Sequence, residues 1–276
     1  MSGWRPAGAV VAIGFMVAFA GCTGSPAEEA GSTPTPTMPP PYDSQRSGTV
    51  ELATGETIGY RCLGEGEPAV MLEAGTDAAG TSAFPGEFVA SIAEDTTVCV
   101  YDRPGTSASS SDPPDRARGY DDLISVLHGV LAALELEPPY VIAGQSGGGN
   151  IAISYAMRHP ERVAGLVTID SYHDDPAAMA AWQAEEGFTW EDNPEHVDWV
   201  QAAAQQDAHP IPIGEFPVRI LSATQADPGG VENQAYWLGL SSDARQIVIE
   251  GPHDLQWAAP DAVAAEFRTL LDELQQ

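Results

Sequence analysis

Short apolar segments alternate along this chain with segments whose apolar residues recur at helical spacing, and this alternation constrains its fold more than any other feature. Continuous apolar segments of this kind are typical of strands that are buried on both faces of a sheet. The helical spacing is clearest over residues 123–134 and 263–274. The pattern predicts an α/β fold with a mainly parallel, eight-stranded sheet and helices on both faces. The expected strands cover residues 49–52, 57–61, 69–72, 97–101, 140–143, 163–169, 218–222 and 246–249.

The first 46 residues differ in composition from the rest of the chain. Residues 9–20 form an apolar stretch that is too short to span a bilayer but typical of a signal peptide. Cys22 follows Phe-Ala-Gly, which resembles the processing site of bacterial lipoproteins. We expect a signal peptide over residues 1–21, a lipidated Cys22 with a Pro/Thr-rich linker over residues 22–46, and a folded domain over residues 47–276. The lipid would anchor an exported protein to the extracytoplasmic face of the cell membrane. An ordinary secretory signal with an unmodified cysteine is the alternative.

The chain carries 40 acidic and 11 basic residues, which gives a formal net charge of −29 at pH 7. Because this charge repels phosphates, a nucleic-acid partner is excluded. Residues 171–217 interrupt the strand–helix alternation and hold ten acidic residues, no basic residue and three tryptophans. We expect them to form a short helical cap over the carboxyl end of the sheet, where ligands bind in such folds. The charge of the cap favours neutral or cationic substrates, and its tryptophans either pack the cap or line the substrate site.

The sequence Gly-Gln-Ser-Gly-Gly over residues 144–148 places Ser146 between an expected strand and an expected helix. This is the G-x-S-x-G pattern in the context of a nucleophile elbow, where a sharp turn leaves no room for side chains beside the serine. Gly147 lies at the helix N-terminus, where its backbone N–H can be donated to a developing oxyanion. We therefore expect Ser146 to be a catalytic nucleophile; a glycine-rich turn capped by serine is the alternative.

A serine nucleophile needs a base, and the base needs an orienting carboxylate. Of the six histidines, only His253 lies late in the chain on a loop that directly follows a strand. Asp227 lies in the loop after the preceding strand, from which we expect it to reach His253. Asp170, at the end of the strand that follows the elbow helix, is the alternative acid. The sequence thus predicts a triad of Ser146, Asp227 and His253.

Several further segments match a known family. They are Glu73-Ala-Gly-Thr76, Cys99-Val-Tyr-Asp-Arg-Pro-Gly105, Arg158-His-Pro-Glu-Arg-Val163 and Gly165-Leu-Val-Thr-Ile-Asp170. Together with the elbow, they make residues 49–276 resemble the α/β-hydrolase superfamily, and more narrowly its single-domain, esterase-like hydrolases of actinobacterial type. The order of the three expected triad residues along the chain is that of the superfamily.

The resemblance implies a serine hydrolase that cleaves small-molecule esters through an acyl-enzyme, with no cofactor and no metal. It also implies that the backbone N–H groups of Gly147 and Thr76 stabilise the oxyanion. In the loop that holds Thr76, Ala74 stands where many members have a histidine. A thioesterase, peptidase or perhydrolase of the same fold remains open, as does a non-catalytic, ligand-binding lipoprotein.

Cys62 and Cys99 are the two cysteines of the expected domain. The strand order of the family places the second and fourth strands side by side, which brings these residues together. Because an exported protein folds in an oxidising compartment, we expect a disulfide between them. Two buried thiols are the alternative.

Overall fold

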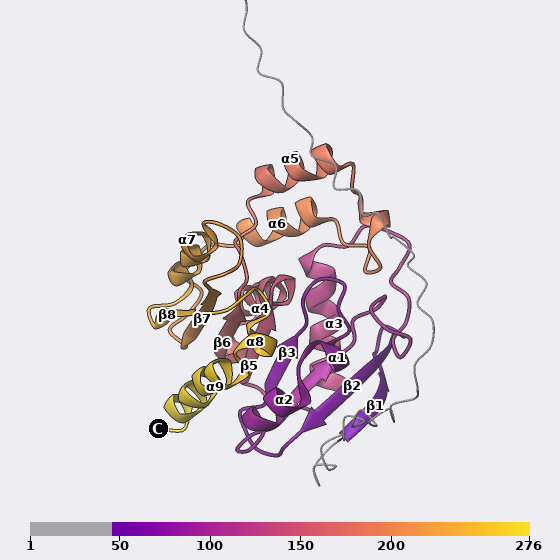
Figure 1. Ribbon diagram of the computed structural model, residues 1–276. Coiled ribbons are helices and arrows are strands. Elements are labelled where there is room, and N and C mark those ends of the chain that lie inside the picture. Colours follow the sequence, from indigo (N-terminus) through magenta and orange to yellow (C-terminus); the bar gives the residue numbers. More distant parts are fainter. Residues whose placement is uncertain (1–45) are drawn as a thin grey trace, which may run out of the picture. The chain divides into compact units, whose positions relative to one another are not determined.

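The structure is a computed structural model and describes residues 46–276, in which eight strands form one sheet (Figure 1). The strand order is β1-β2-β4-β3-β5-β6-β7-β8. The pairs β1–β2 and β2–β4 are antiparallel, whereas every pair from β4 to β8 is parallel. The sheet is therefore mixed, and its parallel part is the part that the alternation predicts. The strands are β1 (Arg46–Glu51), β2 (Thr57–Leu63), β3 (Val70–Glu73), β4 (Val98–Tyr101), β5 (Tyr140–Gln145), β6 (Val163–Ile169), β7 (Val218–Ala223) and β8 (Ala244–Ile249).

Helices follow the strands, as the alternation requires. Short 3₁₀ turns occur at Pro160–Arg162, Trp190–Asp192 and Ala235–Leu240. The helices are α1 (Gly80–Ala83), α2 (Gly86–Ile92), α3 (Tyr120–Ala133), α4 (Gly147–Arg158), α5 (Pro176–Glu186), α6 (Trp199–Asp207), α7 (Gly230–Gln234), α8 (Leu255–Ala258) and α9 (Pro260–Leu274).

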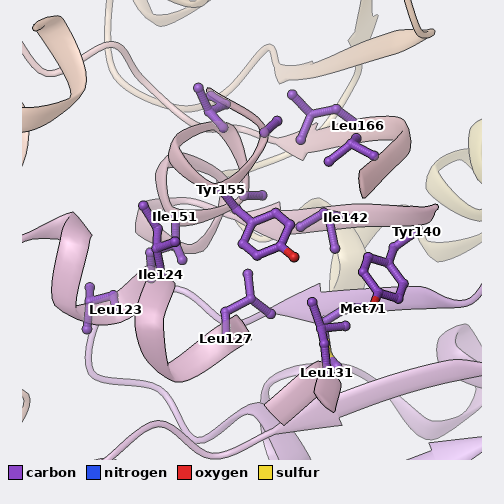
Figure 2. Close-up of a cluster of buried hydrophobic side chains, with 14 of the residues drawn as sticks. Met71, Leu123, Ile124, Leu127, Leu131, Tyr140, Ile142, Ile151, Tyr155 and Leu166 are labelled. Carbon is purple, nitrogen blue, oxygen red and sulfur yellow. The ribbon is translucent and has the colours of Figure 1, made fainter. Parts of the chain in front are cut away.

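Two apolar clusters cover the two faces of the sheet. One joins α3 and α4 to one face, and Figure 2 shows it at Leu127, Ile142 and Tyr155. The other joins α2 and α9 to the opposite face, with Phe88 and Phe267 in edge-to-face contact. The central strands are buried on both faces, which explains why their sequences are continuously apolar rather than alternating.

The expected disulfide is present in the structure between Cys62 of β2 and Cys99 of β4. The two residues lie directly opposite each other in the antiparallel β2–β4 pair, with their Cα atoms 4.1 Å apart. The bridge closes a loop with a sequence separation of 37 residues. On the chain-entropy model, such a loop contributes roughly 3 to 4.7 kcal/mol to stability.

The segment between β6 and β7 forms the expected helical cap. Its helices α5 and α6 lie together over one end of the sheet (Figure 1). Trp182 of α5 and Trp199 of α6 line a cavity together with Ser146, which follows β5. The cap helices therefore lie at the carboxyl end of the strands. The segment between β6 and β7 is thus helical and lies beside the cavity that Ser146 lines.

The N-terminal predictions fall outside the described residues. These are the signal peptide over residues 1–21, the lipidation of Cys22 and all of the linker except its last residue, which begins β1 at Arg46. Within residues 46–276, no helix combines the length and the apolar character that a membrane span needs.

Candidate functional site

Ser146 lies at the sharp turn between β5 and α4. Its backbone has φ 53° and ψ −129°, a combination that costs energy for any residue with a side chain. Its N–H donates to the carbonyl of Ile169 at 2.9 Å, which ties the turn to the end of β6. The strained conformation presents the hydroxyl at the carboxyl end of the sheet, as the elbow pattern predicts.

Two glycines of the pattern are required by close backbone approaches. A Cβ atom at Gly144 would lie 2.3 Å from the backbone carbonyl of Gly148. A Cβ atom at Gly148 would lie 2.2 Å from the carbonyl oxygen of Ala74, in the loop after β3. The backbone of the elbow therefore packs directly against itself and against the backbone of the loop after β3, which leaves no room for side chains at these two positions.

His253, in the loop after β8, contacts Asp170 at the end of β6. The distance between His253 Nδ1 and Asp170 Oδ2 is 2.7 Å, and the Asp170 side chain is 0% exposed. The other oxygen of Asp170 accepts the N–H of Ala223 at 2.9 Å and the amide of Gln234 at 2.6 Å. Both oxygens are thus hydrogen-bonded, which fixes the carboxylate and, through it, the imidazole ring.

The preferred acid of the sequence prediction, Asp227, is wrong in this structure, and the alternative, Asp170, takes its place. Asp170 directly follows the last residue of β6 in a left-handed conformation with φ 48°, so its side chain turns into the sheet edge. Asp227 lies four residues beyond the end of β7, on an exposed part of the loop that leads to α7. It makes no hydrogen bond to His253. Asp227 instead lies on the wall of a cavity that His253 also lines.

The environment of His253 favours the protonated ring. The hydrogen bond to Asp170 raises the pKa of His253 above its usual value of 6.5, and burial opposes this effect. The charges of Asp170, Asp254 and Asp227 raise the pKa further. An imidazole held in this way accepts a proton readily, as a general base must.

Thr76 and Gly147 meet beside Ser146. A Cβ atom at Gly147 would lie 2.5 Å from Thr76 Oγ1 and 3.5 Å from the backbone nitrogen of Thr76. The loop after β3 and the N-terminus of α4 are therefore in direct contact. The helix N-terminus adds the positive end of its dipole to this position. The two backbone N–H groups that the resemblance implies as oxyanion donors are thus neighbours.

A buried arginine supports the loop in which Ala74 replaces the usual histidine. Arg103 follows β4 and donates to the carbonyl of Ala74 at 2.8 Å and to that of Gly75 at 2.7 Å. It also lies 3.3 Å from a carboxylate oxygen of Glu73. Burial alone would lower the pKa of Arg103, but the facing carboxylates raise it, so the side chain stays charged. The charge and the two backbone contacts hold the conformation of the loop that ends at Thr76.

The cap supplies the main counter-ion of this arginine. Glu195 is 1% exposed. Its carboxylate accepts hydrogen bonds from Arg103 Nε at 2.6 Å and from Arg103 Nη2 at 2.8 Å, which makes the ion pair bidentate. The same carboxylate accepts the N–H of Asp77 at 2.8 Å, in the peptide that follows Thr76. Arg118 donates to the Glu195 carbonyl at 3.1 Å. Sequence reasoning missed this cluster, because the cap contains no basic residue of its own and both arginines come from the sheet domain.

Two cavities meet at Ser146, and Tyr172 lines both of them. The first, here termed the oxyanion-side cavity, has a volume of about 240 Å³. The second, the histidine-side cavity, has a volume of about 620 Å³. The oxyanion-side cavity is lined further by Thr76, Gly147, Asn150, Asp174, Met179, Trp182 and Trp199. The histidine-side cavity is lined further by Gln225, Ala226, Asp227, Pro252 and His253.

Within residues 46–276, no three histidine, cysteine, aspartate or glutamate side chains converge as a metal site would require. The groups that do converge are a serine, a histidine with its carboxylate and two backbone N–H groups. This set can transfer an acyl group from an alcohol or amine to water.

Comparison with known proteins agrees with this geometry. Residues 70–209, just over half of the chain, match the family model described as alpha/beta hydrolase fold. The chain belongs to this family. Among solved structures, mouse alpha/beta hydrolase domain-containing protein 10 superposes with a TM-score of 0.68 at 17% identity, over 83% of this chain and 99% of that one. An esterase of Thermogutta terrifontis superposes with a TM-score of 0.62 at 18% identity, over 84% of this chain and 100% of that one.

Curated hydrolases match part of the chain. A Caulobacter segnis protein named for carbamate hydrolysis (RutD) is 29% identical over 126 residues. The 2-hydroxymuconate semialdehyde hydrolase of Pseudomonas sp. strain CF600 is 31% identical over 134 residues. The matches span 46% and 49% of this chain, and 45% and 47% of the two relatives. The chain thus matches about half the length of these relatives, which supports the hydrolase family without fixing a substrate.

The contact between His253 and Asp170 predicts a measurable difference between two aspartates. Asp170→Asn removes the hydrogen-bonded charge, so we expect the pKa of His253 to fall, whereas Asp227→Asn removes only a more distant charge and lowers it much less. Titration of the His253 ring by NMR measures both. An equal or larger shift in the Asp227 variant would contradict the assignment.

The buried pair predicts a loss of stability when the cap carboxylate is neutralised. Glu195→Gln leaves Arg103 with Glu73 as its remaining carboxylate, so we expect the free energy of unfolding to fall by about 3 kcal/mol. Glu191→Gln, at an exposed position of the same cap, removes the same charge and is expected to change it by less than about 0.5 kcal/mol. Urea denaturation of both variants provides the comparison, and equal midpoints would show that the pair does not anchor the cap.

Proposed function

We propose that this protein is a serine hydrolase of small esters that works through Ser146, His253 and Asp170. The observation that supports the proposal most is the contact between the imidazole of His253 and the buried carboxylate of Asp170, on a cavity that Ser146 also lines. The order of the three residues along the chain remains serine, aspartate, histidine, although the acid lies one strand earlier than the sequence predicts.

The proposed reaction proceeds by two acyl transfers. Ser146 Oγ attacks the ester carbonyl while His253 accepts its proton, and the same proton is then given to the leaving alcohol as its C–O bond breaks. Water, deprotonated by His253, attacks the acyl-serine and releases the carboxylic acid and the free serine. Asp170 keeps the proton of the neutral imidazole on Nδ1, which leaves Nε2 free to act as the base.

The oxyanion of each tetrahedral intermediate would be stabilised by the N–H groups of Thr76 and Gly147. Such donors are worth on the order of 10²–10³ in rate each. The Arg103 contacts to the Ala74 and Gly75 carbonyls orient the peptides that lead to Thr76, so the donor is positioned before substrate binds.

Esters are the substrate class that these residues can hydrolyse without any additional catalytic group. The relatives named for carbamate and for 2-hydroxymuconate semialdehyde hydrolysis indicate that related chains act on other carbonyl compounds. A carbamate, thioester or amide presents the same carbonyl to the serine, so each belongs in the substrate panel. The chemistry at the serine is common to all of them.

The proposal requires Ser146 for turnover. We expect Ser146→Ala to lower kcat on p-nitrophenyl butanoate by at least about 10⁴, because the nucleophile of the acyl-enzyme is lost. We expect Ser82→Ala, at an exposed position of α1, to leave kcat within about twofold. A fluorophosphonate label on the wild-type protein should map by mass spectrometry to Ser146; labelling at another serine would overturn the assignment.

We also propose that the protein is exported and held at the extracytoplasmic face of the membrane by a lipid on Cys22. The Phe-Ala-Gly-Cys sequence supports this location, and so does the disulfide, since such bridges persist in oxidising compartments.

Replacement of the expected lipidation site tests that location. We expect Cys22→Ser to move the protein from the membrane fraction to the soluble exported fraction, because two or more acyl chains on one cysteine supply the anchoring energy. Immunoblotting of fractionated cells measures the distribution. Retention of the variant in the membrane fraction would contradict lipid anchoring at this residue.

A further inference from the structure

The oxyanion-side cavity has an unusual lining for a site that takes a simple acyl chain. Besides the nucleophile and the oxyanion donors, its wall contains the aromatic side chains of Tyr172, Trp182 and Trp199 together with the carboxylate of Asp174. An apolar acyl chain would be served by the rings alone. A carboxylate among them is a costly feature that calls for a partner.

Asp174 has no cationic partner in the part of the chain that the structure describes. Its Oδ2 accepts a hydrogen bond from the Asn150 amide at 3.1 Å, and none of the described ion pairs includes it. Burial raises the pKa of Asp174 to about 6, while the charge of His173 and the Tyr120 hydroxyl act in the opposite direction. The group is therefore still mainly ionised at pH 7.5, and it is a half-buried carboxylate that forms no ion pair with an arginine in the described residues.

The tryptophans are placed to complete a cation site. Trp182 projects from α5 with 43% of its surface exposed, and Trp199 begins α6 on the same cavity. Trp182 contacts Phe188 of the cap, with ring centroids 5.7 Å apart, and part of its surface remains open. Indole faces attract ammonium groups, and the attraction grows where water is excluded. Aromatic rings around a carboxylate are thus suited to a quaternary or primary ammonium group.

The position of the cavity indicates which part of the ester it would receive. His253 has to deliver a proton to the leaving oxygen, so the leaving group lies in the histidine-side cavity. The acyl part then extends on the other side of the carbonyl, past Thr76 and Gly147, into the oxyanion-side cavity.

We propose that the oxyanion-side cavity binds an ammonium group carried by the acyl part of the substrate, between the Asp174 carboxylate and the rings of Trp182 and Trp199. This inference rests on the proposed ester hydrolysis and specifies its substrate class. The ten acidic residues of the cap, which has no base of its own, add a field that draws cations toward this cavity. Hydrolysis of such an ester releases an ammonium-bearing carboxylic acid and an alcohol.

Two pairs of isosteric esters test the proposal. The acyl pair is p-nitrophenyl 4-(trimethylammonio)butanoate and p-nitrophenyl 5,5-dimethylhexanoate, which differ only in nitrogen against carbon. The leaving-group pair is butanoylcholine and 3,3-dimethylbutyl butanoate. Each kcat/KM is divided by the rate constant for hydroxide-catalysed hydrolysis of the same ester, so that intrinsic reactivity cancels.

We expect the cationic acyl ester to be preferred over its neutral isostere by at least about tenfold. We expect Asp174→Asn, which keeps the shape and can still accept from Asn150, to reduce this preference to below about threefold. Trp182→Leu, at an exposed position where folding is not at stake, should reduce it about threefold. Asp175→Asn is the matched control, because it removes the neighbouring charge at the N-cap of α5, which acts on the cavity only from a distance, and it should change the preference by less than about twofold.

The outcomes separate the two levels of the proposal. Hydrolysis of both acyl esters without a cation preference, or with a preference that Asp174→Asn leaves intact, would overturn the ammonium site and leave the esterase function standing. A preference confined to the choline pair would overturn the assignment of the cavity to the acyl part. If the wild-type protein hydrolyses none of the four esters, the proposed function and the site are both overturned.

Discussion

The buried pair between Arg103 and Glu195 is the interaction on which the site depends. It joins three segments that are far apart in sequence: the loop after β3, the loop after β4 and the cap between β6 and β7. A buried arginine is tolerated only when its charge and its donors are all matched, and here two carboxylates and two backbone carbonyls match them. Because two of those acceptors belong to the loop that ends at Thr76, the conformation of this loop depends on the charge balance of the pair.

The remaining parts of the site follow from the order of the sheet. The strands β5, β6, β7 and β8 are parallel neighbours, so the residues that follow them converge at one edge. Ser146 follows β5, Asp170 follows β6 and His253 lies in the loop after β8. The carboxylate of Asp170 is therefore one strand from Ser146 and two strands from His253, and the 2.7 Å contact spans β7. A residue at the very end of a strand can make that contact because its backbone is fixed by the sheet.

The sequence was sufficient for those features that depend on local patterns. Continuous apolar segments predict the buried strands from β3 to β7, because these strands are covered on both faces. The glycines around Ser146 predict the elbow, because the backbone segments approach closely there. The choice between Asp170 and Asp227 depends on how far a loop carries a side chain from its strand, and no pattern in the loop encodes that distance. The Arg103–Glu195 pair was equally out of reach, because its members are separated by 92 residues and both types usually lie on the surface. The mismatch at Ala74 was the one signal that something else must hold the loop.

The same pair couples the sequence of the cap to that of the loop after β3, so that the two segments have to be exchanged together. A cap taken from another hydrolase and grafted between β6 and β7 would bring its own substrate preference, but unless it also carried an acid at the position of Glu195 it would leave Arg103 without its main counter-ion. Recombination of substrate specificity in this chain is therefore limited to caps that preserve one carboxylate, whatever else they change.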